Sequence, residues 1–295
     1  MKTHKREIVI YTLAALAILS AVCYFFGKMK ESKEVVQTDL FSLTAPEPYA
    51  ILTVNRPATF AKMMLAKPRI YQVFASEIPE IYLSILKQNT TIPSLQFSFH
   101  PSGIVMYAKA DKSIAERIES EILRKTFNSF APQKQTKGEI AFTYFPDTDN
   151  RFFGFYRYNG IWVASYSKKL LEKVADIQIN NKNYITEEEA KLYKTLDVNA
   201  PLNLLIKSEK LDLFPKANDL SQWGFNGKWL GADLFESEGN ICYFSNLPYY
   251  EPADTLYQTI IDTLSVRLKK QFPQLHITGQ SYEENGKFYY TGCTN

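Results

Sequence analysis

The longest apolar run of the chain lies close to the N-terminus, where no charged residue occurs between Ile8 and Phe26. At about 1.5 Å of rise per residue, a helix of this length spans the roughly 30 Å hydrocarbon core of a bilayer. The run is rich in alanine and leucine, which favour helix formation. We therefore predict a transmembrane anchor over residues 8–27, with residues 8–26 crossing the membrane, after a short N-terminal tail of residues 1–7.

Two other interpretations of the apolar run fit less well. A cleaved signal peptide has a shorter apolar core followed by small residues at the cleavage site, whereas this run ends in Tyr24 and two phenylalanines. A lipoprotein signal needs a small residue directly before the modified cysteine, but Val22 precedes Cys23. An uncleaved signal anchor fits the pattern best.

Flanking charge does not decide the orientation of the anchor, because basic residues are equally frequent on its two sides. They are Lys2, Lys5 and Arg6 before the anchor and Lys28, Lys30 and Lys33 after it. Because so short a tail is easily retained in the cytoplasm, we predict a single-pass protein of the bacterial inner (cytoplasmic) membrane with an extracytoplasmic, periplasmic domain. The opposite orientation would leave that domain in the cytosol.

After the anchor, residues 28–43 are polar and lack a sustained period, so they are predicted to form a stalk. From residue 44 onward, alternating apolar positions predict strands, and apolar positions every three or four residues predict amphipathic helices. Strands are predicted at 49–54, 95–100, 104–108, 140–144, 152–158, 161–165 and 202–206. Helices are predicted after Arg56, around 114–122, after Ser167, after Thr186 and at 253–271. Asn-Gly pairs at 159–160, 226–227 and 285–286 predict two-residue hairpin turns.

A weak internal repeat consists of a glycine turn, an apolar strand and a helix, and its units begin at Gly103, Gly160 and Gly239. Because hairpins alternate with single helices, the predicted fold class is α+β, with mainly antiparallel sheets and amphipathic helices packed on one face. Residues 44–295 would form one soluble α+β region. An Asn- and Lys-rich stretch indicates a division of this region into two halves near residues 178–200.

Composition and charge narrow the class of partner. The 19 tyrosines and 20 phenylalanines favour sheets. The net charge is only +3 and lysines alternate with acids, so no basic stripe is present that would bind a row of phosphates, and we predict no nucleic-acid partner. Cys242 and Cys293 lie in the soluble region and would be able to pair in an oxidising compartment. Otherwise they are small buried hydrophobes.

Motifs for nucleotides and metals are missing from the sequence. Neither glycine-rich phosphate-loop pattern occurs. Asp147, Asp149 and Asn150 resemble the start of a calcium loop, but Arg151 occupies a position that requires an oxygen ligand. The histidines of the soluble region, His100 and His276, have no His or Cys neighbour at metal-ligand spacing. We therefore predict no metal and no cofactor, and interpret both histidines as ordinary strand residues.

Candidate nucleophiles and acids also have structural explanations. Ser165 and Lys168 match the Ser-x-x-Lys pattern of penicillin-binding proteins, but the partner motifs of that family do not occur. Ser167 is placed to cap the following helix. Glu187 to Glu189 complement a helix dipole, and Thr186 and Glu189 have capping-box spacing. A cluster of aromatic residues is expected to pair across strands rather than to line a ligand groove: Phe152, Phe153, Phe155, Tyr156 and Tyr158. No catalytic, cofactor-binding or metal-ligating residue is predicted.

The segment from Phe152 to Val174 resembles a recurrent element of bacterial envelope proteins of the DUF3352 type, in which an apolar strand, a serine and a helix follow one another. Residues 202–207, 229–234 and 240–245 are similar to later elements of the same layout. The resemblance covers most of residues 44–295 without a diagnostic motif, and the glycine expected soon after Phe244 is missing. It implies an anchored envelope protein of uncharacterised function and transfers no catalytic residue.

These observations favour a non-enzymatic binding or scaffold component of the cell envelope, which contacts the membrane through residues 8–26 and binds a protein partner that the sequence does not identify. The alternative is a hydrolase-like envelope enzyme whose site is assembled from residues distant in sequence. A deep pocket with mutually hydrogen-bonded ionisable groups would favour the enzyme. A shallow surface with an exposed apolar patch would favour the binding protein.

Overall fold

The computed structural model describes residues 17–25, 39–66, 71, 74–75, 77–88, 91–207, 229–237, 240–247, 278–284 and 287–293. Several predictions concern other parts of the chain and lie outside the described residues. These are residues 8–16 and 26–27 of the anchor, most of the stalk, the turns at 226–227 and 285–286, Gly239, the helix at 253–271 and His276.

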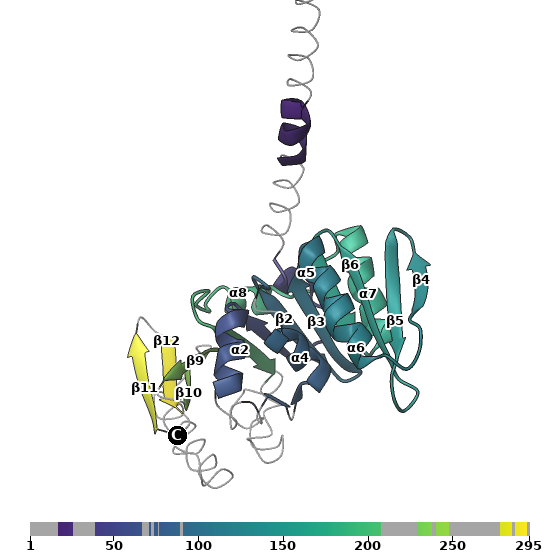
Figure 1. Ribbon diagram of the computed structural model, residues 1–295. Coiled ribbons are helices and arrows are strands. Elements are labelled where there is room, and N and C mark those ends of the chain that lie inside the picture. The colour runs from purple at the N-terminus through teal and green to yellow at the C-terminus, as the bar shows by residue number, and fades with distance from the viewer. Residues whose placement is uncertain are drawn as a thin grey trace, which may run out of the picture.

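The strands form one antiparallel sheet (Figure 1). They are β1 (Ala50–Val54), β2 (Leu95–His100), β3 (Gly103–Lys109), β4 (Gln133–Lys137), β5 (Ile140–Pro146), β6 (Phe152–Tyr158), β7 (Ile161–Ser165), β8 (Leu202–Lys207), β9 (Trp229–Ser237), β10 (Asn240–Leu247), β11 (Thr278–Glu284) and β12 (Lys287–Cys293). Their order in space is β11-β12-β10-β9-β8-β1-β2-β3-β7-β6-β5-β4. Every neighbouring pair is antiparallel. The predicted α+β class with an antiparallel sheet is confirmed.

Helices pack on both faces of this sheet, so the prediction that they pack on one face was wrong. The helical elements are η1 (Phe41–Leu43), α2 (Pro57–Ala66), α4 (Glu80–Gln88), α5 (Lys112–Arg117), the π-helical η2 (Ile118–Leu123), α6 (Arg124–Thr126), α7 (Lys168–Asn180) and α8 (Glu187–Tyr193). Side chains of α2, α4, α5 and η2 form one core cluster with Met106 and Ala108 of β3. Side chains of α7 form a second cluster with Val105 and Tyr107 of the same strand.

The reason for this difference is visible in the strands themselves. Successive residues of a strand point to opposite faces, so the two clusters bury β3 from both sides. In β7 every residue from Ile161 to Ser165 is buried. A continuous apolar run such as Ile161-Trp-Val-Ala is typical of a strand covered on both faces, whereas strict alternation is typical of a strand covered on one.

The sheet contains two similar halves that meet at the β1–β8 pair. Outward from β1 the strands are β2, β3, β7 and β6, and outward from β8 they are β9, β10, β12 and β11. In each half, the first hairpin (β2–β3 or β9–β10) lies beside the central strand, β1 or β8. The later hairpin (β6–β7 or β11–β12) joins the first through its second strand, β7 or β12. The first half carries β5 and β4 in addition at its edge.

This correspondence revises the predicted repeat of three units. Gly103 opens β3 and Gly239 precedes β10, and these strands occupy equivalent positions. Gly160 instead precedes β7, whose equivalent is β12. The Asn-Gly pairs at 159–160 and 285–286 therefore stand between the strands of equivalent hairpins. By strand order the sheet therefore repeats in two units rather than three.

Residues 39–49, termed the strap, lie against the α7 face of the sheet before the chain enters β1. Leu40, Phe41 and Leu43 are buried there, and the ring of Phe41 stacks on that of Tyr193 with 3.9 Å between centroids. The Gln96 amide of β2 donates hydrogen bonds to the Leu40 carbonyl (3.1 Å) and the Thr44 hydroxyl (3.0 Å). The predicted stalk boundary at residue 43 is therefore too late, because the fold already includes Leu40.

A buried polar network fixes the ends of β1, β8 and β9. The Asn55 amide donates to Asn203 Oδ1 (2.5 Å) and to the Ala200 carbonyl (3.0 Å), and the Asn203 amide donates to Asp233 (2.7 Å). Burial raises the pKa of the Asp233 carboxyl, and the donated hydrogen bonds from the Asp197 backbone and from Asn203 oppose that increase. Because a buried carboxylate is costly unless it is hydrogen-bonded, this network ties the turn after α8 to the centre of the sheet.

Local sequence signals were mostly informative. β6 and β7 flank Asn159-Gly160, which have positive φ angles as a two-residue hairpin turn requires. The predicted caps are confirmed: Ser167 Oγ accepts a hydrogen bond from the Leu170 backbone (3.4 Å), and Thr186 and Glu189 form a capping box. Strand β4 was not predicted, since its five residues are all polar and all exposed and thus carry no apolar alternation.

Gly154 of β6 lies where the core approaches the backbone most closely. A Cβ atom there would lie 2.7 Å from Tyr144 Cε1 and 3.0 Å from Leu171 Cδ2. We expect Gly154→Ala to lower the free energy of unfolding by about 1–3 kcal/mol, because a filled core accommodates an added methyl group poorly.

Gly231→Ala is the matched control in another strand. Its Cβ would lie 3.2 Å from the Leu196 side chain and 3.3 Å from that of Leu192, further than the contacts at Gly154, so the cost should be smaller. Urea unfolding of both variants provides the measurement. Equal costs, or a larger cost at Gly231, would contradict this account of the packing.

Candidate functional site

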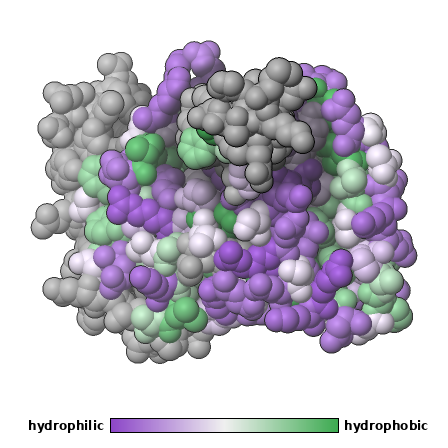
Figure 2. Space-filling view, turned by 45° about the horizontal axis from the view of Figure 1, so that its top comes forward, coloured by the Kyte–Doolittle hydropathy of each residue, from purple (hydrophilic) through white to green (hydrophobic). Residues whose placement is uncertain are grey.

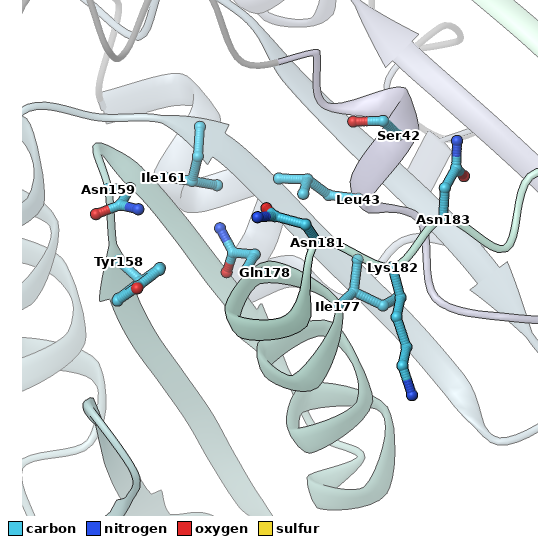
Figure 3. A pocket seen from close by; sticks show the side chains of 10 residues that line it. All are labelled: Ser42, Leu43, Tyr158, Asn159, Ile161, Ile177, Gln178, Asn181, Lys182 and Asn183. Carbon is cyan, nitrogen blue, oxygen red and sulfur yellow. The ribbon is translucent and has the colours of Figure 1, made fainter.

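The strap and α7 together line two hollows on the same face of the sheet. The first, termed the amide hollow, has a volume of about 230 Å³ (Figure 3). The second, termed the charged hollow, has a volume of about 530 Å³. Neither was predicted, because each combines strap residues with residues more than a hundred positions further along the chain.

The amide hollow lies at the C-terminal end of α7. Three buried apolar side chains form part of its lining, namely Leu43, Ile161 and Ile177. The other lining residues are polar: Ser42, Tyr158, Asn159, Gln178, Asn181, Lys182 and Asn183. They come from the strap, the β6–β7 turn and the end of α7. Figure 3 shows the amides of Gln178 and Asn181 pointing toward Ile161 and Leu43, whereas Lys182 extends away along the helix.

The charged hollow lies between the Pro46-Glu47-Pro48 part of the strap, the start of α8 and the end of β8. Its ionisable lining residues are Glu47, Lys173, Tyr184, Glu189 and Lys207. Glu189 is already used, since its carboxylate accepts hydrogen bonds from the Thr186 backbone (2.6 Å) and hydroxyl (2.8 Å). Among the described residues, no hydrogen bond or ion pair joins two of the ionisable side chains of this hollow. It therefore lacks a paired acid and base.

A buried hydrogen-bonded chain lies beneath the strap. The Ala45 N–H donates to the Tyr107 hydroxyl (3.0 Å), which lies 3.0 Å from Ser98 Oγ. Ser98 Oγ lies 2.8 Å from His100 Nε2. Each hydroxyl has one proton to donate, so the chain is satisfied when Tyr107 donates to Ser98 and Ser98 donates to His100. The proton of the neutral imidazole is then on Nδ1.

This environment keeps His100 uncharged. Burial lowers the pKa of His100 to about 4. The backbone carbonyl groups of Glu47 and Pro46 oppose the decrease, although none of the described groups forms a hydrogen bond of normal geometry with Nδ1. The Lys173 ammonium adds to the decrease. The interpretation of His100 as an ordinary strand residue overlooked this role, which follows from contacts with the strap.

The Ser98–His100 contact is the arrangement that most resembles a nucleophile and its base. A catalytic serine must be reached by its substrate, but Ser98 is fully buried and His100 is 4% exposed. The hydroxyl is also held between Tyr107 and the imidazole. The geometry therefore explains how the strap is fixed, and it offers no path for a substrate to Ser98 in this conformation.

The Ser-x-x-Lys match has a structural explanation. Ser165 is buried, donates a hydrogen bond to the Ile104 carbonyl (2.8 Å) and accepts one from the Ser167 backbone (3.0 Å). Lys168 points elsewhere, to Gln135 at 2.9 Å. A serine in this position cannot act as an exposed nucleophile beside a lysine base.

The acidic residues considered as metal ligands or as a carboxylate cluster also have partners within the protein. Asp147 accepts hydrogen bonds from the Tyr166 hydroxyl (2.8 Å) and the Thr148 backbone (2.8 Å). Glu187 forms an ion pair with Lys191 (2.7 Å) on the helix surface. In the part of the chain that the structure describes, no group of three or more His, Cys, Asp or Glu side chains could hold a metal ion.

The aromatic cluster of β6 is divided between the two faces of the sheet. Phe153 and Phe155 belong to the α4 and α5 side of the core, and Tyr156 belongs to the α7 side. Tyr156 packs edge-on against Phe142 of the neighbouring strand, with 5.2 Å between centroids. Phe155 also pairs across strands, with its ring centroid 6.1 Å from that of Phe145. The prediction thus holds for Tyr156 and Phe155, whereas Phe152 is exposed and Tyr158 lines the amide hollow.

Comparison with known proteins provides one fold relationship. No protein-family model matches the chain, and no curated protein matches it in sequence. A crystal structure, crystal form I of TP0453, matches with a TM-score of 0.53 over 86% of this chain and 92% of that chain, at 10% identity. The chain resembles TP0453 in fold. TP0453 is a Treponema lipoprotein associated with the bacterial envelope, and at this identity the similarity concerns the fold alone.

Residues 17–25 are helical, and all of them are exposed. Within the described residues, no helix is both long enough and apolar enough to cross a membrane. The exposed side chains of this helix include Ile18, Leu19, Val22, Tyr24 and Phe25, each at least 44% exposed.

The buried histidine predicts a specific dependence of stability on pH. A histidine in an unfolded chain has a pKa of about 6.5, and that of folded His100 is about 4. Between these values the unfolded state binds more protons, so the free energy of unfolding should decrease as the pH falls from about 6.5 to about 4. His100 should account for on the order of 3 kcal/mol of that decrease.

Urea unfolding at a series of pH values, on the chain that lacks residues 1–27, measures this effect. His100→Gln keeps a polar partner for Ser98 but does not titrate in this range. The variant should therefore show a smaller decrease over the same interval, with carboxylates accounting for what remains. An identical pH profile in both proteins would contradict the assignment of His100 as a buried neutral group.

Proposed function

We propose that this protein is a single-pass, membrane-anchored component of the bacterial cell envelope with an extracytoplasmic domain that binds or organises other molecules without catalysing a reaction. The observation that carries the proposal is the helix at 17–25. Its apolar side chains are exposed on all sides. Such a helix requires lipid or a partner around it, and the uncharged sequence continues on its N-terminal side to Ile8.

The cysteines support the proposed orientation. Cys242 is disulfide-bonded, and its direct neighbour across the β10–β12 pair is Cys293. Cys23, by contrast, is free. Disulfides persist in oxidising compartments such as the periplasm and are rare in the cytosol. The flanking charges left the orientation open, and the disulfide favours the extracytoplasmic side.

The fold supports an envelope role in a general way. TP0453, which has a similar fold, is associated with the bacterial envelope. The layout that resembles proteins of the DUF3352 type is consistent with the same location. Neither relationship specifies a partner, so the proposed protein partner in the envelope rests on the anchored architecture.

The surface of the domain favours binding over catalysis. The two hollows contain amides or separated charges rather than mutually hydrogen-bonded ionisable groups, which an acid–base mechanism needs. On the face shown in Figure 2, hydrophilic residues predominate, and the hydrophobic residues are scattered among them. This face therefore presents polar groups, and among its described residues the broad apolar patch that would mark a protein-binding surface is not seen.

An envelope hydrolase remains the alternative, and the Ser98–His100 contact is the observation that favours it. If the strap moved away in solution, Ser98 would become accessible and a fluorophosphonate probe would label it. We expect no labelling of the full chain and none of the Ser98→Ala variant. Covalent labelling of Ser98 in the unmodified protein, shown by mass spectrometry, would establish the enzyme instead.

The anchor and its orientation are tested together with single cysteines on its two sides. In a Cys23→Ala background, Ser32→Cys should react with an impermeant maleimide on intact spheroplasts, and Thr3→Cys should react only after lysis. The reason is that the apolar run separates the two positions by the thickness of a bilayer. The full chain should also sediment with membranes, and deletion of residues 1–27 should release a folded, soluble domain.

The reverse labelling pattern would place the domain in the cytosol. Labelling of both positions on intact spheroplasts would refute a membrane-spanning segment. Recovery of the truncated chain only as insoluble aggregate would contradict the division into an anchor and an independent domain.

A further inference from the structure

We propose that the amide hollow binds one ring of a neutral saccharide. This inference deepens the proposed binding function and rests on it. The argument depends on the lining of the hollow, on the unused hydrogen-bonding groups at its rim and, among the described residues, on its single charged lining residue, which extends away.

The lining matches the two kinds of surface on a sugar ring. A pyranose has an apolar face of C–H groups and an edge of hydroxyls, each of which donates and accepts hydrogen bonds. Leu43, Ile161 and Ile177 form an apolar floor that is continuous with the core cluster under α7. Asn159, Gln178 and Asn181 stand at the rim (Figure 3), and a side-chain amide also both donates and accepts.

These amides have hydrogen-bonding capacity that the described protein does not use. No hydrogen bond within the described residues involves the side chain of Asn159 or Asn181, and the Gln178 NH₂ group has no protein partner among them. Gln178 Oε1 is engaged, since it accepts the hydroxyl proton of Tyr156 at 2.5 Å. Gln178 is therefore oriented from below, with its two N–H donors left for a ligand.

The charges of the residues that line the amide hollow favour a neutral sugar over an anionic ligand. The charged lining residue is Lys182, and Figure 3 shows its side chain extending away from Asn181 and Leu43. The lysines Lys173 and Lys207 line the other hollow. An acidic ligand would gain little from a site of amides, whereas uncharged hydroxyls pair with amides without the cost of burying a charge.

Backbone geometry alone explains why asparagine is tolerated at two of these positions. Asn159 (φ 46°) lies in the hairpin turn, and Asn181 (φ 48°) ends α7 in the left-handed conformation. Glycine suits both positions at least as well. Replacement by glycine therefore removes each amide while the backbone keeps its conformation, which separates a role in binding from a role in folding.

The test uses the full chain in a sugar-free zwitterionic detergent and ligand-observed saturation-transfer NMR. The probes are glucose, N-acetylglucosamine and the corresponding trimers, maltotriose and chitotriose, with glucuronate as the anionic comparison. We expect millimolar binding of at least one neutral sugar, weaker binding of glucuronate, and an affinity reduced at least tenfold in the Asn159→Gly/Asn181→Gly double variant. Asn180→Ala is the matched control, because the Asn180 amide bonds back to the Asp176 carbonyl and lies outside the hollow.

Binding of a trimer that is tighter than that of its monosaccharide, and lost in the double variant, would identify a glycan chain as the source. Equal binding of both would identify a free sugar. Absence of saturation transfer to every neutral probe, or unchanged affinity in the double variant while the fold is retained, would overturn the proposal. Either result would leave the membrane location intact, since the cysteine-labelling experiment reports on it separately.

Discussion

The antiparallel pairing of β1 with β8 is the constraint on which the rest of the molecule depends. It is the contact where the two halves of the sheet meet, and it joins strands whose first residues lie about 150 positions apart in the sequence. Neither half would be complete without the other, because Leu202 of β8 packs in the same core cluster as the helices that follow β1. The Asn55–Asn203–Asp233 network closes one end of this junction, so that register errors there would leave a buried carboxylate without donors.

The strap completes one face of this framework and lines both of its hollows. It enters directly before β1, and its backbone and side chains are fixed by Gln96, Tyr107 and the stacked ring of Tyr193. Burial of Leu40 and Phe41 fixes the chain at a defined place on the α7 face before it enters β1. The same segment supplies walls to both hollows. A molecule bound in either hollow would thus contact the segment that directly precedes β1.

The sequence predicted the local elements well and their assembly poorly. Alternation located β2, β5 and β8, the Asn-Gly pair located the β6–β7 hairpin, and the caps at Ser167 and Thr186 were correct. These signals arise from a residue's immediate neighbours. The sequence analysis did not predict helices on both faces of the sheet. An apolar run such as Ile161 to Ala164 indicates a buried strand, but it does not indicate which elements pack on it. The hollows were missed for a related reason, since Asn159 and Asn181 look like ordinary turn and cap residues until Leu43 is brought beside them by the strap.

The distribution of satisfied and unsatisfied polar groups indicates where function resides on this face. Deep in the fold, Ser98, Tyr107 and Gln96 use their hydrogen bonds to hold the strap, and His100 is kept neutral by burial. Such groups stabilise one conformation, and a ligand could engage them only by breaking bonds that the protein already makes. At the rim, the backbone positions Asn159 and Asn181, and Tyr156 orients Gln178, whose NH₂ group has no partner among the described residues. The proposed binding site thus combines buried groups that hold one conformation beneath it with amides that keep unused hydrogen-bonding capacity above it.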